Sequence, residues 1–218
     1  MFDINTQLLV LFEFCIFLTV VGMQIARRSS RMMMLYLLQS LAVVGLVLIS
    51  SIEEKHVSLF IVGIVILLIK GIAAPIFFSR FITREQRDLR AETYLNLPVT
   101  LVVMLGLMMF VRSAYLAPLL AFFPANSMAM TLVISGVFIS LFLIVNRRGV
   151  LAQLIGILSF ENGLVAFSTL SGTIHSYIIE AWILFDILLW IIIAIILSRF
   201  VHNHFGTHDT RKMSILKQ

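Results

Sequence analysis

Cysteine and charge are both scarce in this chain of 218 residues. One cysteine, Cys15, excludes an internal disulfide and any site built from several cysteines, such as an iron–sulfur centre. It lies within an apolar run, so we expect a small buried core residue there. Charged residues make up only 12% of the chain and hydrophobic residues 61%, whereas about a quarter of a soluble domain is charged. The composition predicts an integral membrane protein.

The motifs of soluble enzymes are also absent. The chain has no glycine-rich phosphate loop, no nucleophile elbow and no paired cysteines, so we expect a non-catalytic protein without a cofactor. Four tail residues could ligate a metal, but their spacing matches no recognised ligand set, and we expect no metal site. These residues are His202, His204, His208 and Asp209. The net charge of +5 does not indicate nucleic acid, because the basic residues occur in short loops, where they set topology and contact membrane lipids.

The sequence consists mainly of long apolar runs. A helix needs about 20 mostly apolar residues to cross the hydrocarbon core. Seven runs qualify, at residues 7–25, 32–51, 58–82, 95–111, 127–145, 150–170 and 178–200. We therefore predict an all-α, polytopic membrane helix bundle with about seven transmembrane helices. No basic residue precedes the first run, so we expect that run to remain as a span rather than to be cleaved.

The segment after the fourth run, residues 113–126, is harder to assign. Pro118 and Pro124 argue against one continuous helix through it. It could extend the span, lie in the membrane interface or re-enter the bilayer.

Basic residues alternate between loops and predict an orientation. They lie at or after the ends of the first, third, fifth and seventh runs, at Arg27, Arg28, Arg31, Arg80, Arg84, Arg87, Arg90, Arg147, Arg148, Arg199, Arg211, Lys212 and Lys217. The intervening loops hold only Lys55 and Arg112. Because positive loops stay in the cytoplasm, we predict that the N-terminus lies outside and the C-terminus inside.

This pattern suggests four parts. They are N-terminal transmembrane helices in residues 1–112, an outer connecting segment at 113–126, a three-helix unit at 127–200 and a cytoplasmic tail at 201–218. The first and last three helices would enter in the same direction, and each trio has an arginine pair between its first two members. A duplicated unit would explain this, but arginine pairs are common at cytoplasmic turns, and we favour that explanation.

Ionisable residues within the predicted spans are the candidate functional residues. Glu161 and Asp186 lie at similar depths of the sixth and seventh helices, and Lys70 lies near the middle of the third. Such residues mark ion and proton paths in membrane proteins, so we predict a proton path through these three. For Glu13 in the first helix, a place in that path and a purely structural role in packing are equally well supported. Gln39 in the second is expected to be a polar packing residue.

The sixth helix has two distinct sides. Small residues recur on one side at helical spacing, at Ala152, Gly156, Ser159, Gly163 and Ala166. Such stripes let another helix backbone approach closely. Glu161 points to the opposite side, so both sides are expected to face protein.

Several segments resemble hydrogenase-4 component E. They are YLLQSL (36–41), KGIAAP (70–75), QLIGILSFENG (153–163), EAWILFD (180–186) and HFGTHD (204–209). That family belongs to the membrane arms of energy-converting [NiFe] hydrogenase and formate hydrogenlyase-type complexes, which are related to respiratory complex I. The resemblance implies a multi-pass subunit of a prokaryotic plasma membrane. Its implied partners are antiporter-like subunits and homologues of the H, J and N subunits of complex I.

The last three predicted helices also resemble the K subunit of complex I, through NRRGVLAQLIG (146–156). Two buried acids of that subunit are thought to pass protons along the membrane. This chain departs from the pattern, because Leu158 stands where the K subunit has its glutamate and Glu161 follows one turn later. The second acid is Asp186 rather than a glutamate.

Three functions remain open at this stage. The first is a proton-path and scaffold subunit of such a complex, and the second is a purely structural subunit of the same arm. A stand-alone secondary carrier is third, because the sequence lacks a matching pair of broken helices.

Overall fold

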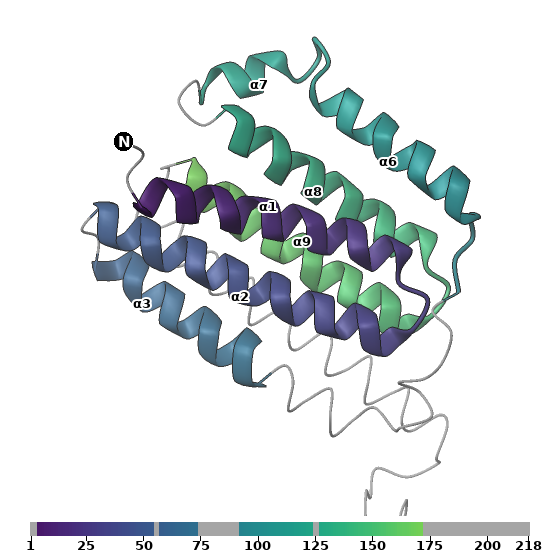
Figure 1. Ribbon diagram of the computed structural model, residues 1–218, viewed down its shortest axis with the longest axis horizontal. Helices are drawn as coiled ribbons and strands as arrows, with labels where there is room; N and C mark the ends of the chain where they lie inside the picture. Colours follow the sequence, from purple (N-terminus) through teal and green to yellow (C-terminus); the bar gives the residue numbers. More distant parts are fainter. Residues whose placement is uncertain (1–3, 55–56, 74–91, 124–126, 172–218) are drawn as a thin grey trace, which may run out of the picture. The chain divides into compact units, whose positions relative to one another are not determined.

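The computed structural model describes residues 4–54, 57–73, 92–123 and 127–171. Within these ranges every regular element is a helix, as predicted (Figure 1). The elements in chain order are α1 (Ile4–Ile25), α2 (Ser29–Glu54), α3 (Val57–Ile66), the π-helix η1 (Leu67–Ala73), α6 (Leu97–Val111), α7 (Ala117–Ala121), α8 (Ser127–Asn146) and α9 (Val150–Leu170).

Four of these helices are long and apolar enough to cross a membrane. They are α1, α2, α8 and α9, which coincide with the first, second, fifth and sixth predicted spans. By length and composition these are the helices of a membrane protein. The α6 helix has 15 residues and is shorter than a full span. The predicted seventh helix, residues 178–200, lies outside the described residues, so the total of seven spans stays a prediction.

The segment after α6 does not extend that helix. The α6 helix ends at Val111, and α7 begins only at Ala117 after an intervening turn. Pro118 lies in the first turn of α7, where its missing N–H removes no intrahelical hydrogen bond. The prediction that no single helix runs through residues 113–126 agrees with the described part of that segment, residues 113–123, while Pro124 lies outside the described residues.

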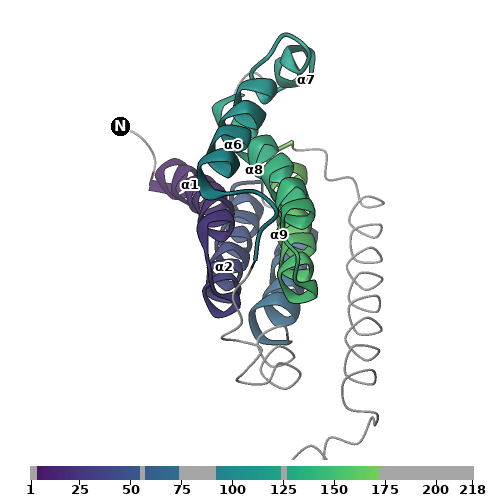
Figure 2. The same cartoon turned by 90° about the vertical axis from the view of Figure 1, so that its right-hand side faces the viewer.

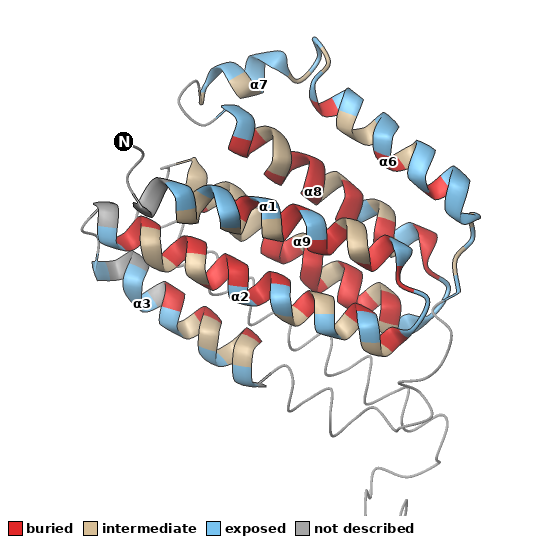
Figure 3. Cartoon of the chain, in the orientation of Figure 1, coloured by how far each residue is buried: buried red, intermediate tan, exposed pale blue. Residues whose placement is uncertain are grey.

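Two helical hairpins, α1–α2 and α8–α9, form the centre of the bundle (Figure 2). The α1 helix packs against α2 and α8, and α9 packs against the same two helices. On the outside, α3 and η1 lie on α2, while α6 and α7 lie on α8. Buried residues concentrate where the central four helices face one another, whereas α6 and α7 expose most of their surface (Figure 3).

Small residues set the close approach of α9 to α8. A Cβ added to Gly156 would lie 2.9 Å from Ile144 Cγ1, and one added to Gly163 would lie 2.8 Å from Val137 Cγ2. Both contacts are shorter than real Cβ atoms show. The predicted small-residue side of this helix thus faces α8, as expected for close helix packing.

The described parts of three loops that the arginine pattern assigns to the cytoplasm, at residues 26–28, 92–96 and 147–149, meet at one end of the bundle. Arg147, between α8 and α9, donates to the carbonyls of Met23 and Gln24 at the end of α1. The chain entering α6 reaches the same place, because Tyr94 N donates to Asn146 O at 2.9 Å. We call this the arginine end. Its existence agrees with the alternation of the loops, while the orientation in a membrane stays a prediction.

Candidate functional site: a buried ion pair and its polar chain

The sequence supplies two opposite charges that the fold brings together inside the bundle. Lys70 Nζ lies 2.7 Å from Glu161 Oε1. The lysine side chain is 0% exposed and the glutamate side chain 2%. A lone charge in such a position would be very unfavourable, and pairing with a hydrogen-bonded partner is the usual way in which a buried charge is tolerated. Both residues had been predicted as site residues, and the structure places them in direct contact.

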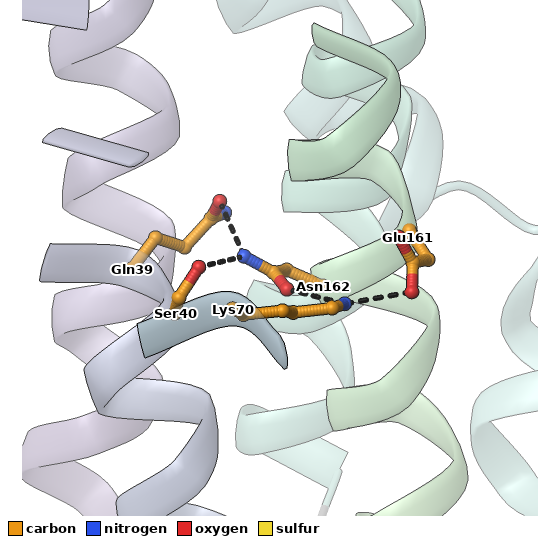
Figure 4. Close-up of polar contacts among 5 residues, drawn as sticks. All are labelled: Gln39, Ser40, Lys70, Glu161 and Asn162. Atoms are coloured by element: carbon orange, nitrogen blue, oxygen red, sulfur yellow. Dashed lines mark hydrogen bonds and ion pairs between the residues drawn. The ribbon is translucent and has the colours of Figure 1, made fainter. Parts of the chain in front are cut away.

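Asn162 extends this pair toward α2 (Figure 4). Its Oδ1 accepts a hydrogen bond of 2.9 Å from Lys70 Nζ. Its Nδ2 donates to Ser40 Oγ at 3.0 Å and to Gln39 Oε1 at 3.3 Å. Asn162, Ser40 and Gln39 are each at most 1% exposed. A continuous polar chain therefore links η1, α9 and α2.

The depth of this site follows from helix geometry. Glu161 lies eleven residues after Val150, the start of α9, which is about 16 Å at 1.5 Å per residue. Gln39 lies ten residues after Ser29, or about 15 Å from the start of α2. The hydrocarbon core is about 30 Å thick. Both estimates therefore put the polar chain near the middle of the spans.

Lys70 is carried by a π-helical segment rather than by the regular α-helix that the sequence predicted for residues 58–82. The α3 helix ends at Ile66, and η1 covers Leu67–Ala73. Hydrogen bonds from i to i+5 accommodate an extra residue per turn and so turn the following side chains about the axis. Hydrophobic periodicity does not record this change of hydrogen-bond register, so the π-helix could not be predicted from the apolar pattern. The π segment is what presents Lys70 to α9.

The other two predicted site residues stand apart from this chain. Glu13 is buried in α1 at 6% exposure, beside Phe12, which packs on the apolar cluster of the bundle. No hydrogen bond or ion pair joins it to Lys70 or Glu161 in the described part of the chain. Asp186 lies outside the described residues, as do the histidines of the tail.

Two residues of the polar chain, Asn162 and Ser40, had been given no role. Asn162 follows Glu161 directly, but no role had been assigned to it. Gln39 was predicted to be a buried polar residue that packs against a neighbouring helix, and it accepts a hydrogen bond from Asn162 of α9. Ser40 lies in the quoted YLLQSL segment, and its hydroxyl accepts from the same amide. An asparagine beside an acid within an apolar run is the signal that could have pointed to this network.

Arg147 had been assigned only to topology, yet it is 1% exposed. Its guanidinium donates to two carbonyls that the last turn of α1 leaves without intrahelical donors, including Gln24 O at 2.8 Å. Desolvation by burial lowers the pKa of Arg147 to about 10, so the side chain remains charged at neutral pH. Its neighbour Arg148 is exposed and lies over the Tyr94 ring, with its Cζ 4.6 Å from the ring centre. Arg147 thus binds carbonyls at the end of α1, whereas Arg148 makes an exposed contact with the Tyr94 ring.

Comparison of the chain with protein-family models, with curated proteins and with solved structures finds no match.

Proposed function

We propose that this chain is a non-catalytic subunit of an energy-converting, membrane-bound [NiFe] hydrogenase or formate hydrogenlyase-type complex in a prokaryotic plasma membrane. In that complex it contributes to the buried path that carries protons, or sodium ions, and to assembly of the membrane arm. Its partners are antiporter-like subunits and homologues of the H, J and N subunits of complex I. The segments that resemble hydrogenase-4 component E support the choice of complex.

The single observation that supports a role in ion translocation is the Lys70–Glu161 pair. It is fully buried, near mid-depth, and bonded through Asn162 to two further polar side chains. Ionisable groups are costly in this environment and are retained in membrane proteins mainly for ion or proton movement. A pair of a base and an acid can exchange a proton without either group facing lipid as an isolated charge.

The same contact supports a second candidate, a purely structural role. The ion pair joins η1 to α9, which lie far apart in the sequence, and it could serve only to hold these segments together. Replacing both members of a buried ion pair by apolar residues is often neutral for stability, whereas removing one member costs about 3–5 kcal/mol. This difference allows the two roles to be separated.

The test compares Glu161→Gln, Lys70→Met and the double variant Lys70→Met with Glu161→Leu. Complexes are isolated in mild detergent to record assembly, and proton uptake or membrane potential is measured in vesicles beside hydrogen turnover. If the pair translocates ions, the double variant assembles but does not pump. Ser140→Ala is a matched control for assembly, since Ser140 is equally buried and, among the described residues, bonds only to Ser159.

A double variant that both assembles and pumps at the original rate would leave only the structural role. Copurification tests the choice of complex independently. Isolation of the full chain as a stable, monodisperse monomer, with no hydrogenase-type subunit bound, would contradict membership of the complex.

A further inference from the structure

The interior of the central helices differs on the two sides of the Lys70–Glu161 pair. On the side away from the arginine end, an apolar cluster fills the space between the helices. Its buried members are Ile16, Ala42, Val43, Val44, Leu46, Val47, Ile66, Val133 and Ala166. Hydroxyls in this half bond to carbonyls of their own helices, as Ser51 does to Leu48 O at 2.6 Å and Thr169 to Val165 O at 2.9 Å. These hydroxyl protons therefore have acceptors within their own helices.

On the side toward the arginine end, polar side chains bond between helices. Ser140 of α8 and Ser159 of α9 lie 3.0 Å apart through their hydroxyl oxygens. Gln24 of α1 donates from Nε2 to Ile139 O of α8 at 3.2 Å. All three side chains are at most 2% exposed. Buried polar groups therefore occur at several depths between the middle of the bundle and the loops at this end, among buried apolar side chains such as Met32 and Leu143.

Two buried amide atoms in this half have no hydrogen-bond partner among the described residues. They are Gln39 Nε2 and Gln24 Oε1. The orientation of each amide is fixed by its other half: Gln39 Oε1 accepts from Asn162, and Gln24 Nε2 donates to Ile139 O. One amide thus leaves a donor near the ion pair, and the other leaves an acceptor near the arginine end.

Ordered water is the usual partner of such atoms. Buried polar groups are nearly always satisfied, and a site with two to four polar neighbours is where a buried water is found. A water can accept from Gln39 Nε2 and pass its own protons on, and another can donate to Gln24 Oε1. Gln24 lies next to the last residue of α1, whereas Gln39 lies about 15 Å along α2 from the same end. At about 2.8 Å per hydrogen bond, a file of about four waters spans the distance between the two side chains.

We propose that water binds in this half of the bundle, between Gln39 Nε2 and Gln24 Oε1, and connects the Lys70–Glu161 pair to the arginine end. Protons then enter or leave the pair from that end only, because the apolar cluster closes the other. The role of these waters as proton carriers rests on the proposed function, whereas their presence does not.

Glu13 is the competing route. It is a buried acid in the opposite half, and it makes no hydrogen bond or ion pair within the described residues. A path through Glu13 would bring water to the apolar cluster around Val43, which is 0% exposed. Access to Val43 is therefore the control for access to Gln39.

The experiment measures water access with Ag⁺, a small ion that reacts with thiolates reached through water. Gln39→Cys and Val43→Cys are each made in the full-length chain carrying Cys15→Ala, and membrane vesicles of both orientations are prepared. After exposure to Ag⁺, remaining thiols are labelled with a maleimide in denaturant. Arg28→Cys in the same vesicles reports which side the arginine end faces.

We expect Ag⁺ to protect Gln39→Cys at least about tenfold faster from the arginine end than from the other side. Val43→Cys should be protected equally slowly from both sides. Equal protection of Gln39→Cys from both sides, faster protection from the far side, or rapid protection of Val43→Cys would each overturn the proposal. Should Gln39→Cys fail to insert, Ser40→Cys changes a single atom at the same depth and takes its place.

This assay does not depend on pumping, so it separates the two proposals. One-sided access with unchanged pumping in the Lys70 and Glu161 variants would keep the water file and reject the proton path. Loss of pumping without one-sided access would do the reverse.

Discussion

The ammonium of Lys70 donates to Asn162 Oδ1 at 2.9 Å, and this bond determines which way the Asn162 amide faces. An ammonium has no acceptor, so the amide must turn its oxygen to η1. Its nitrogen then faces α2, where it donates to Ser40 Oγ and Gln39 Oε1. The charge on η1 thus fixes the orientation of the Asn162 amide, and this orientation determines its hydrogen bonds to α2.

Replacing Asn162 should therefore disturb three segments at once. Asn162→Leu keeps the branched shape of the side chain but removes every one of these bonds, and it leaves a buried lysine with one bond fewer. We expect a loss of roughly 3 kcal/mol in the free energy of unfolding, because bonds to charged groups are worth more than neutral ones. An SDS titration in mixed micelles measures the loss. Ser140→Ala, which removes a single neutral bond, should lose about 1 kcal/mol, and an equal effect of the two changes would contradict the central place of Asn162.

The contact of α9 with α8 predicts opposite effects for two glycines. Gly156→Ala would put a Cβ 3.2 Å from the backbone nitrogen of Ile144, so the helices must move apart. We expect a loss of roughly 1–3 kcal/mol, as for other overpacked sites. Gly136→Ala in α8 meets no heavy atom within 4 Å and should be neutral or gain up to about 1 kcal/mol from helix propensity. The same titration compares them, and a destabilised Gly136→Ala would argue against this packing.

The two members of the arginine pair should respond very differently to substitution. Arg147→Met removes the donors from two buried carbonyls at the end of α1, and we expect a loss of roughly 2–3 kcal/mol. Trypsin should then cleave faster at the exposed Arg28, because the end of α1 is no longer held. Arg148→Met removes only an exposed cation–π contact and should lose less than about 1 kcal/mol. Similar cleavage rates in the two variants would show that the buried guanidinium does not hold α1.

Thiol labelling can test the topology at exposed positions. In a Cys15→Ala chain, Arg28→Cys and Arg148→Cys should react with an impermeable reagent from one side of the membrane. Tyr115→Cys, at a position 86% exposed beyond the far end of α6, should react from the other. Reaction of Tyr115→Cys from the outside in intact cells is the result that the arginine alternation predicts. Labelling of all three from one side would contradict it.

The sequence was sufficient for the parts of the structure that depend on hydropathy. Four spans lie where the apolar runs predicted them, and Lys70 and Glu161 could be placed near mid-depth from their positions in those runs. The small residues of 150–170 also indicated correctly a side for close packing. Each of these properties depends on the residues of one segment alone.

What could not be predicted depends on contacts between segments. Arg147 was interpreted by its charge, because nothing in its own segment shows that the end of α1 lies within reach. Asn162 and Ser40 are joined to Lys70 by hydrogen bonds that depend on where the π-helical segment places the lysine side chain. The hydrophobic periodicity of a helix shows which of its sides is apolar, but not which side chains of other helices it contacts.

The long separation between Lys70 and its partners also has a consequence for biogenesis. The ammonium of Lys70 enters the translocon well before the ribosome has made Glu161 or Asn162. On insertion scales a lysine at a helix centre costs about 2.5–3.5 kcal/mol. Until the second hairpin follows, the nascent chain holds a segment with an unmatched charge, kept near α2 by the packing of Gly63 against Leu48. Chains whose synthesis stops before residue 150 should therefore be recognised and degraded by membrane quality control, since only complete synthesis supplies the opposite charge.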